Sequence, residues 1–370
     1  MRAAGAGRAD RRGRAFLMGL ALAAALAAAA RAQPFGTWMT SSPGFPVSHG
    51  YVRVPPRPAL NSTRAFTFEA WVAISNGTVG EDCRSIAGKN WTKAWWIGQC
   101  NDASGQPTLR SYLRREGPPG RNGGIIPRGV WTHVAVVFDR ARRLHYVNGE
   151  LAAEFPEAGR LTTSGDEVRI GSDVQWPRSP NGAIDEVRLW NVARTQAQIR
   201  EWINRRITTA QPGLVAVWAL DGTPKDSFHR HDGAAMGTGL GVGSFAALPG
   251  CAGLAGPEAL CLHNRFLVTA QWRANPVPGT PPDSSARVGG SSPSSGVFWF
   301  LAADDWEVLV KAIDACVAPY NRYWIFSATT AGVFYRLEVL DLRGEQKIYF
   351  NYPGPPPPAV TDFNAFATCP

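Results

Sequence analysis

Aromatic and acidic side chains beside turn residues are the groups in this sequence best suited to bind a ligand. Trp91 and Trp95 lie in the segment 90–96, and a later loop contains Asp173 and Trp176. An aromatic face can stack on a sugar ring, while carboxylates and amides fix its hydroxyl groups. We therefore predict that these four residues bind ligand, with Trp91 and Trp176 as first choices because both lie outside alternating runs. The sequence has 14 Trp, and most of them must belong to the core.

Catalytic patterns are weaker than this binding pattern. His133 follows Trp131 in an alternating run, and we interpret it as a core or rim histidine and not as a general base. The sequence contains no G-x-S-x-G elbow and no Gly-rich phosphate loop ahead of a helix. We therefore predict that the protein is not an enzyme.

The elements that position these side chains are predicted to be β-strands. Residues 131–138 alternate β-branched and aromatic types, and a second run at 144–147 ends in Asn148-Gly149. This pattern is typical of an antiparallel pair with a tight turn. Both faces of 131–138 are apolar, which predicts a central strand of a two-layer core. One short helix is expected after Thr195, where a T-x-x-Q capping box precedes apolar residues at helical spacing.

The start of the chain has the composition of a targeting segment. Residues 1–32 contain a basic stretch, an uncharged apolar run and Ala30-Arg31-Ala32, which together are typical of a secretory signal peptide. That segment holds six Arg and one Asp of a chain with formal charge +9. The remaining Arg residues are scattered, so we predict no nucleic-acid binding. The apolar run is too short to favour a membrane span, so none is expected in the mature chain.

Six cysteines, an even number, fit disulfide bonding in an exported protein. Cys83 and Cys100 flank a symmetric segment that would bring them together in a hairpin. Fifteen pairings of six cysteines exist. We favour Cys83 with Cys100, Cys251 with Cys261, and Cys316 with Cys369.

Six motifs follow one another in the first two thirds of the chain: FTFEAWV, VWTHVAVVFD, LHYVNGE, IGS, NGAIDEVRLWNVART and LVAVWALD. In this order they resemble a laminin-G-like jelly roll of the concanavalin A-like lectin/glucanase superfamily, over residues 47–236. The resemblance implies two curved antiparallel sheets in a secreted module that binds carbohydrate or protein, often with calcium. Residues 33–46 would form a lead-in segment.

The resemblance also implies where a calcium ion and a hydrolytic site would lie. Asp185, Asp226 and Asp232 correspond to positions of a structural calcium in laminin-G-like folds, and oxygen ligands in loops suit this ion. The segment 226–233 departs from the usual D-x-S-G-N-G-x-D form at Phe228, His229 and Arg230. Glucanases of the superfamily use E-x-D-x-x-E. Here Ala183 and Arg188 replace the two Glu, so this chemistry is not expected.

A second unit is predicted after a Gly/Ala-rich linker at 237–250. Residues 251–370 include ALCLHNRFLVTAQWR, GVFWF, DWEVLVKAIDAC and NRYWIF, and resemble an all-β C-terminal module of bacterial exported proteins. The segment 306–315 alternates, so we predict a strand there and a smaller β-sandwich overall. The predicted fold class is all-β, with a laminin-G-like jelly-roll sandwich, one short helix and this second sandwich.

These patterns together predict a secreted, non-enzymatic recognition protein that binds an extracellular glycan or a protein partner through the loops of the jelly roll, with calcium as a candidate cofactor. A structural or adhesive surface protein without a discrete small ligand is the alternative. A polysaccharide-active enzyme with an unrecognised site ranks third. The expected location is extracellular, at the cell surface or in the periplasm.

Overall fold

The structure is a computed structural model of the 370-residue chain. It describes residues 37–39, 50–74, 83–113, 120–128, 131–180, 182–203, 207–220, 223–237, 240–242, 250–274, 284–342, 345–354 and 359–369. The predicted signal peptide, and the lead-in and linker segments apart from 37–39, Gly237, 240–242 and Gly250, lie outside the described residues.

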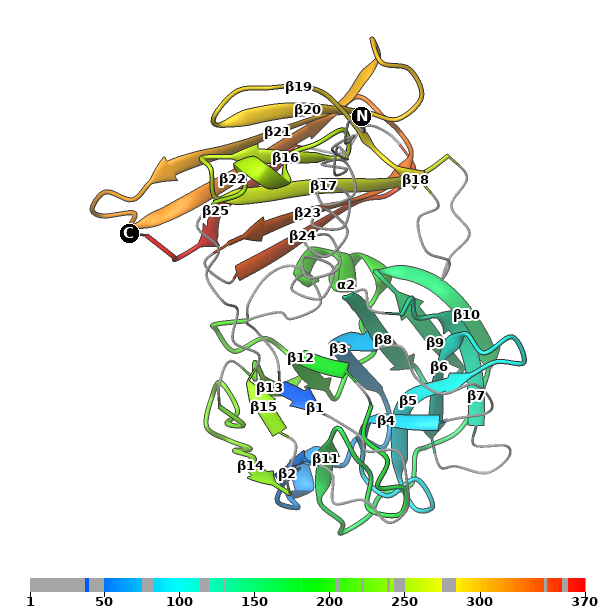
Figure 1. Cartoon of the computed structure of the whole chain (residues 1–370). Coiled ribbons are helices and arrows are strands. Elements are labelled where there is room, and N and C mark those ends of the chain that lie inside the picture. Colours follow the sequence, from blue (N-terminus) through cyan, green and yellow to red (C-terminus); the bar gives the residue numbers. More distant parts are fainter. Residues whose placement is uncertain are drawn as a thin grey trace, which may run out of the picture.

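The first unit is a sandwich of two antiparallel sheets (Figure 1). Sheet A has the order β10-β9-β8-β3-β12-β1-β15, with β13 beside β12. Its strands are β1 (Thr37–Met39), β3 (Phe66–Ile74), β8 (Thr132–Phe138), β9 (Arg142–Val147), β10 (Glu150–Pro156), β12 (Gly182–Trp190), β13 (Leu214–Trp218) and β15 (Leu240–Val242).

Sheet B lies across from sheet A and has the order β14-β2-β11-β4-β5-β6-β7. Its strands are β2 (Tyr51–Val54), β4 (Cys83–Gly88), β5 (Trp95–Asn101), β6 (Pro107–Leu113), β7 (Gly120–Ile125), β11 (Val168–Ile170) and β14 (Ala234–Met236). A 3₁₀ turn, η1 (Pro58–Leu60), follows β2.

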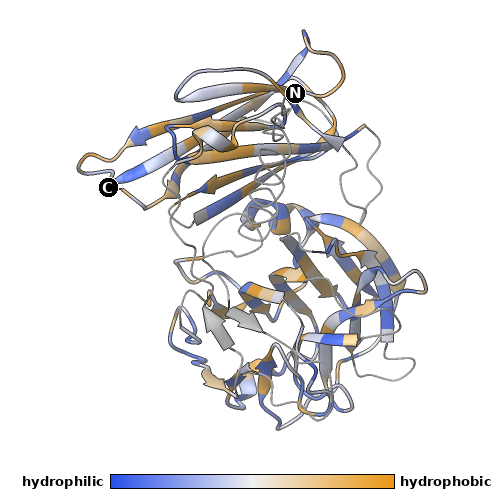
Figure 2. Ribbon diagram, in the orientation of Figure 1, coloured by the Kyte–Doolittle hydropathy of each residue, from blue (hydrophilic) through white to orange (hydrophobic). Residues whose placement is uncertain are grey.

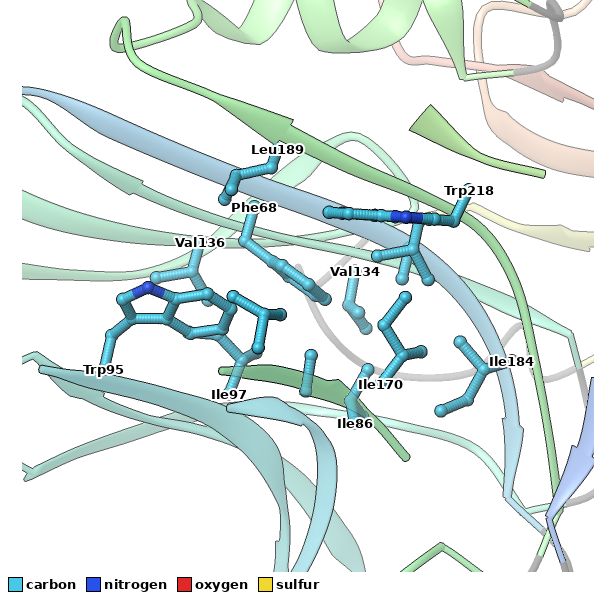
Figure 3. Close-up of a cluster of buried hydrophobic side chains, with 14 of the residues drawn as sticks. Phe68, Ile86, Trp95, Ile97, Val134, Val136, Ile170, Ile184, Leu189 and Trp218 are labelled. Carbon is cyan, nitrogen blue, oxygen red and sulfur yellow. The ribbon is translucent and has the colours of Figure 1, made fainter. Parts of the chain in front are cut away.

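The core lies between sheets A and B, where apolar side chains from both interdigitate (Figure 3). Val134 and Val136 of β8 face this core, while Ala135 and Val137 face the other side, and all four are buried. The predicted central position of β8 is thus confirmed, because β8 lies between β9 and β3. The Asn148-Gly149 turn follows β9, and both residues have positive φ (51° and 73°), which favours Asn-Gly in a tight hairpin.

Helix α2 (Gln196–Trp202) packs on the outer face of sheet A. Thr195 and Gln198 form the predicted capping box, with each side chain bonded to the other's backbone N–H. Ile199 is fully buried against Ala135 and Val137 of β8. Among the described residues, no helix is long and apolar enough to span a bilayer.

The second unit is also an antiparallel sandwich, so the predicted all-β fold class of two sandwiches is confirmed (Figure 1). The 3₁₀ turn η2 (Ala252–Leu254) precedes it. Sheet C has the order β16-β17-β23-β24 with β18 beside β17, and sheet D has the order β19-β20-β21-β22-β25. The strands are β16 (Ala259–Leu262), β17 (Phe266–Arg273), β18 (Ser284–Ser285), β19 (Arg287–Ser291), β20 (Ser295–Trp299), β21 (Trp306–Ala315), β22 (Arg322–Thr329), β23 (Phe334–Asp341), β24 (Glu345–Asn351) and β25 (Val360–Phe366).

Hydrophobic residues concentrate on the strands of both sandwiches (Figure 2). The segment 306–315 is the predicted strand, β21. All three disulfides join the predicted partners, Cys83–Cys100, Cys251–Cys261 and Cys316–Cys369. Cys83 and Cys100 lie opposite each other in neighbouring strands, as the symmetric hairpin required.

The second sandwich covers part of the outer face of sheet A, around Trp71. The ring of Trp71 on β3 stacks on Phe350 of β24, with 6.2 Å between ring centres and 12° between planes. The Tyr352 hydroxyl donates to the Asn148 carbonyl (2.6 Å), and the Arg200 guanidinium lies 3.7 Å from the centre of the Tyr352 ring. This part of sheet A is therefore a contact between the two units and is not open to a ligand.

Candidate functional site

Asp173 ties together the two loops that the sequence singles out. Its buried carboxylate accepts backbone N–H groups from Asn90 (2.8 Å) and Trp91 (3.4 Å) in the β4–β5 turn, and from Gln175 (2.8 Å) and Trp176 (3.1 Å) in its own loop. Burial raises the pKa of this carboxyl group, and the four backbone hydrogen bonds oppose that shift. The Asp173 side chain is therefore a clamp that positions the loops.

Glycine is required beneath this clamp. A Cβ atom on Gly88 would overlap the Asp173 carboxylate. The close approach of β4 to the 173–176 loop thus depends on a residue without a side chain. As a correction to the prediction, Asp173 does not face a ligand, because its carboxylate is fully buried and engaged by the backbone.

Trp176 is half-buried beside β4. Its indole Nε1 donates to the Cys83 carbonyl (3.1 Å), and its own carbonyl accepts from the Ser85 hydroxyl (3.0 Å). The Arg178 guanidinium lies 4.6 Å from the ring centre. The indole is thus fixed beside β4 of sheet B, and the Arg178 guanidinium lies over one face of its ring.

The strands next to Trp176 carry an aromatic cluster on the outer face of sheet B. The Tyr112 ring on β6 meets Trp91 at 5.4 Å and Trp96 at 5.7 Å, both edge to face. The Trp96 indole donates to the Ser85 hydroxyl (2.7 Å), which also bonds Trp176. We call Trp91, Trp96, Tyr112 and Trp176, with Arg110, the aromatic face.

Alternation along the strands explains why this cluster points outward. On β6, Leu109 and Leu113 face the core, so Arg110 and Tyr112 emerge on the other side. On β5, Trp95 faces the core and Trp96 faces outward. A Cβ atom on Gly98 would overlap the Trp96 ring, which lies flat along the outer side of β5.

Trp95 was predicted as a ligand-binding residue, and that prediction is wrong. Only 6% of its surface is exposed, and its ring packs against Phe66 (5.4 Å) and Phe68 (6.1 Å) inside the sandwich (Figure 3). Tyr112 and Arg110 were missed. Their spacing of two in a strand was a usable signal, because it places both on the face opposite Leu109.

Arg110 is the polar group of the aromatic face. Its guanidinium donates to the Tyr112 hydroxyl (3.0 Å) and lies 5.3 Å from the centre of that ring. Within the described residues, its Nε–H finds no acceptor. The aromatic face thus combines ring surfaces with the positive charge of Arg110.

The predicted calcium ligands do not fit a metal ion. Asp226 is buried, and its carboxylate accepts backbone N–H groups from Val217 (3.1 Å), Phe228 (3.3 Å), Arg230 (2.9 Å) and His231 (3.0 Å). A carboxylate has about four lone-pair positions, and these four donors use them. Asp226 therefore acts as a turn cap and has no free oxygen lone pair for a cation.

The two other predicted metal ligands also have local partners. Asp232 accepts the Asp226 N–H (3.1 Å), and Asp185 accepts the Glu186 N–H (2.9 Å). Over the part of the chain that the structure describes, no three His, Cys, Asp or Glu side chains are grouped to hold a metal. The donor set at these residues does not match the oxygen cage that calcium needs.

His133 is a buried histidine, as predicted. Its Nε2 lies 3.5 Å from Glu69, whose other oxygen accepts from Arg194 (2.6 Å). Burial opposes ionisation of Glu69, but its hydrogen bond with His133 and the nearby Arg194 lower its pKa to about 2. Trp71 packs edge-on over His133 and in turn contacts the second sandwich. A polysaccharide cannot reach this acid–base pair.

A second polar cluster lies between β6 and β9 and is centred on the buried His145. His145 Nδ1 lies 3.1 Å from the Gly123 carbonyl and Nε2 lies 2.7 Å from the Ser111 hydroxyl, which fits a neutral ring. Burial, with Arg143 nearby, lowers the pKa of His145 from 6.5 to about 3. Unfolding therefore takes up a proton between these values, and stability falls as the pH falls.

We expect the free energy of unfolding to decrease between pH 6.5 and 4, with His145 contributing up to about 1.4 kcal/mol per pH unit. Urea unfolding at pH 7, 6, 5 and 4 measures this slope. In a His145→Gln variant the slope should be shallower, since the glutamine does not titrate. An equal slope in the two proteins would contradict the assignment.

Comparison with known proteins gives one family match and several structural likenesses. Residues 47–200 match the family model described as the concanavalin A-like lectin/glucanases superfamily. No curated protein matches the chain.

The similar solved structures resemble the chain at low identity. A candidate carbohydrate-binding protein from Bacteroides ovatus is 20% identical over 56% of this chain, with a TM-score of 0.44, and the match spans 59% of that protein's length. A heptameric SAP-like pentraxin from Limulus polyphemus is 14% identical over 59% of this chain and 99% of its own, with a TM-score of 0.41. The CBM40 of the Ruminococcus gnavus IT-sialidase is 15% identical over 36% and 79%, with a TM-score of 0.30.

Proposed function

We propose that the protein binds a carbohydrate chain on the aromatic face of its first sandwich. The observation that carries this proposal is the edge-to-face cluster of Trp91, Tyr112 and Trp96 beside Arg110. Ring faces suit the C–H surface of a sugar, while the Tyr112 hydroxyl and the Arg110 guanidinium suit its hydroxyl groups. The superfamily match over residues 47–200 supports the same class of ligand.

The clamp at Asp173 gives this face the rigidity that binding requires. Trp91 lies 82 residues before Asp173 in the sequence, and Trp176 lies three residues after it. The backbone N–H groups of both tryptophans donate to the Asp173 carboxylate, which fixes their positions. A preformed site loses less entropy when a ligand binds. The loops therefore present their rings in a fixed arrangement.

A folded protein partner at the same face is the alternative ligand. A stable protein interface buries about 1,200–2,000 Å² in total, whereas the aromatic face is a cluster of a few rings, with Trp96 already buried. This size favours a sugar. We further propose that the protein works outside the cytoplasm, because its three disulfides suit an oxidising compartment.

Binding should be lost when the rings of the aromatic face are removed. We expect Trp91→Ala and Tyr112→Ala each to weaken binding by tenfold or more, since truncation of an aromatic anchor costs about 2 kcal/mol or more at a binding hot spot. The measurement is affinity for immobilised neutral polysaccharides, namely arabinan, xylan and β-glucan, by biolayer interferometry. Added calcium and chelator should give the same affinities, since Asp226 has no free lone pair.

The matched control is Trp306→Ala, which removes a tryptophan that is 56% exposed on the second sandwich. It should bind the neutral polysaccharides as the unmodified protein does. If none of them binds, or if both aromatic-face variants bind normally, the proposal is wrong. Circular dichroism of each variant establishes that it is folded.

A further inference from the structure

The second sandwich carries an exposed aromatic surface of its own, on the outer side of sheet D. Tyr320 and Phe363 are 54% and 51% exposed. The Trp324 ring lies between them, 5.0 Å from each and edge to face with both. Phe326 continues the row, 5.6 Å from Phe363. Exposed aromatic groups gathered in this way usually mark an interaction site.

The outward direction of these rings follows from the strand pattern of β22. Tyr323 and Ile325 point into the core of the second sandwich, so Trp324 and Phe326 point to the outside. The first unit contacts the opposite sheet, through Phe350 on β24. The aromatic row therefore lies on a sheet that the contact between the two units does not involve.

A pocket opens at one end of this row, where β22 begins and β25 ends. It is a shallow hollow, open to solvent, with a volume of about 520 Å³. The Cys316–Cys369 disulfide joins the segment before the pocket to the segment after β25. The pocket is lined by Pro319, Tyr320, Arg322, Trp324, Phe363 and Asn364.

The lining carries a positive charge that is not held in an ion pair. Within the described residues, Arg322 has no carboxylate partner. The neighbouring acids are used elsewhere: Asp314 accepts from the Tyr323 hydroxyl and the Cys316 N–H, and Asp362 accepts from the Tyr349 hydroxyl and the Asn364 N–H. A pocket with aromatic walls and an unpaired guanidinium suits a ligand that has both an apolar face and a carboxylate.

We propose that this pocket binds an acidic sugar unit of a polysaccharide, and that it is a second site separate from the aromatic face. The rings would stack on the sugar, Arg322 would pair with its carboxylate, and the Asn364 amide would bind a hydroxyl group. The size of the pocket fits a saccharide better than a folded protein.

The test uses the full chain and uronic-acid oligosaccharides, with tetragalacturonate, alginate tetramers and hyaluronan hexamers as probes in isothermal titration calorimetry. We expect at least one of them to bind and its affinity to weaken from 50 to 500 mM NaCl, since salt screens an exposed ion pair. Arg322→Gln and Phe363→Ala should each lower that affinity by about ten- to hundredfold. The carboxyl-reduced, neutral form of the same oligosaccharide should bind at least tenfold more weakly.

Two controls separate this site from the aromatic face. Trp306→Ala removes an exposed tryptophan that does not line the pocket and should leave uronate binding unchanged. Tyr112→Ala should also leave it unchanged, although that variant loses neutral polysaccharide. The proposal is overturned if no uronate binds, if Arg322→Gln and Phe363→Ala bind normally, or if Tyr112→Ala alone abolishes uronate binding.

Discussion

Replacing Asp173 with alanine should abolish most polysaccharide binding and lower the free energy of unfolding by about 3 kcal/mol or more. Four backbone N–H groups, from Asn90, Trp91, Gln175 and Trp176, would lose their acceptor. A buried donor left without a partner costs about 1–3 kcal/mol. The loops would also separate, so that Trp91 and Trp176 would no longer share one arrangement.

The affinity for polysaccharide measures the loss of binding, and urea unfolding measures the loss of stability. Asp173→Asn keeps one acceptor oxygen and should give intermediate losses. The matched control is Asp102→Ala, because Asp102 caps an exposed turn through the Ser104 and Gln106 N–H groups and lies in no loop of the site. That variant should bind normally. Normal binding by Asp173→Ala would show that the clamp does not position the aromatic rings.

The ion pair between Arg143 and Glu157 should contribute strongly to the stability of the first sandwich. Both side chains are fully buried, and two hydrogen bonds of 2.7 and 2.8 Å join them. Glu157→Ala would remove the carboxylate that makes two hydrogen bonds to this buried guanidinium, and breaking a buried ion pair costs about 3–5 kcal/mol. We therefore expect the urea midpoint to fall sharply in this variant.

The neighbouring residue supplies the control for this prediction. Arg142 pairs with Asp139 and Glu154 at the surface, with half of its side chain exposed, so Arg142→Ala should leave stability nearly unchanged. A double variant, Arg143→Met with Glu157→Leu, removes both charges and should recover much of the loss. Equal effects of Glu157→Ala and Arg142→Ala would contradict the account.

The strands were predictable because alternation and turn residues act locally. The run 131–138, the Asn148-Gly149 turn and the capping box at Thr195 each carry their signal within a few residues, and each appears in the structure. The disulfide between Cys83 and Cys100 was predictable for the same reason, because a single hairpin brings its partners together.

The candidate site was predictable only in part. Trp95 and Trp96 are adjacent, and every residue of β5 is buried, so apolar alternation could not show which ring faces the core. Asp173 and Trp91, whose N–H group bonds to its carboxylate, are 82 residues apart in the sequence. The hydrogen bonds that the Asp226 carboxylate accepts depend on the path of a whole loop. Tertiary contacts of this kind leave no local pattern in the sequence.

The stacking of Trp71 on Phe350 makes the solubility of each sandwich depend on the other. A chain divided between β15 and β16 would expose the apolar surface of Trp71, Trp131 and Ile203 on one fragment and of Ile348 and Phe350 on the other. Such surfaces promote aggregation when they lose their cover. The two units resemble separate modules in sequence, yet in this architecture they share one buried apolar contact, and each fragment alone would leave its half of that contact uncovered.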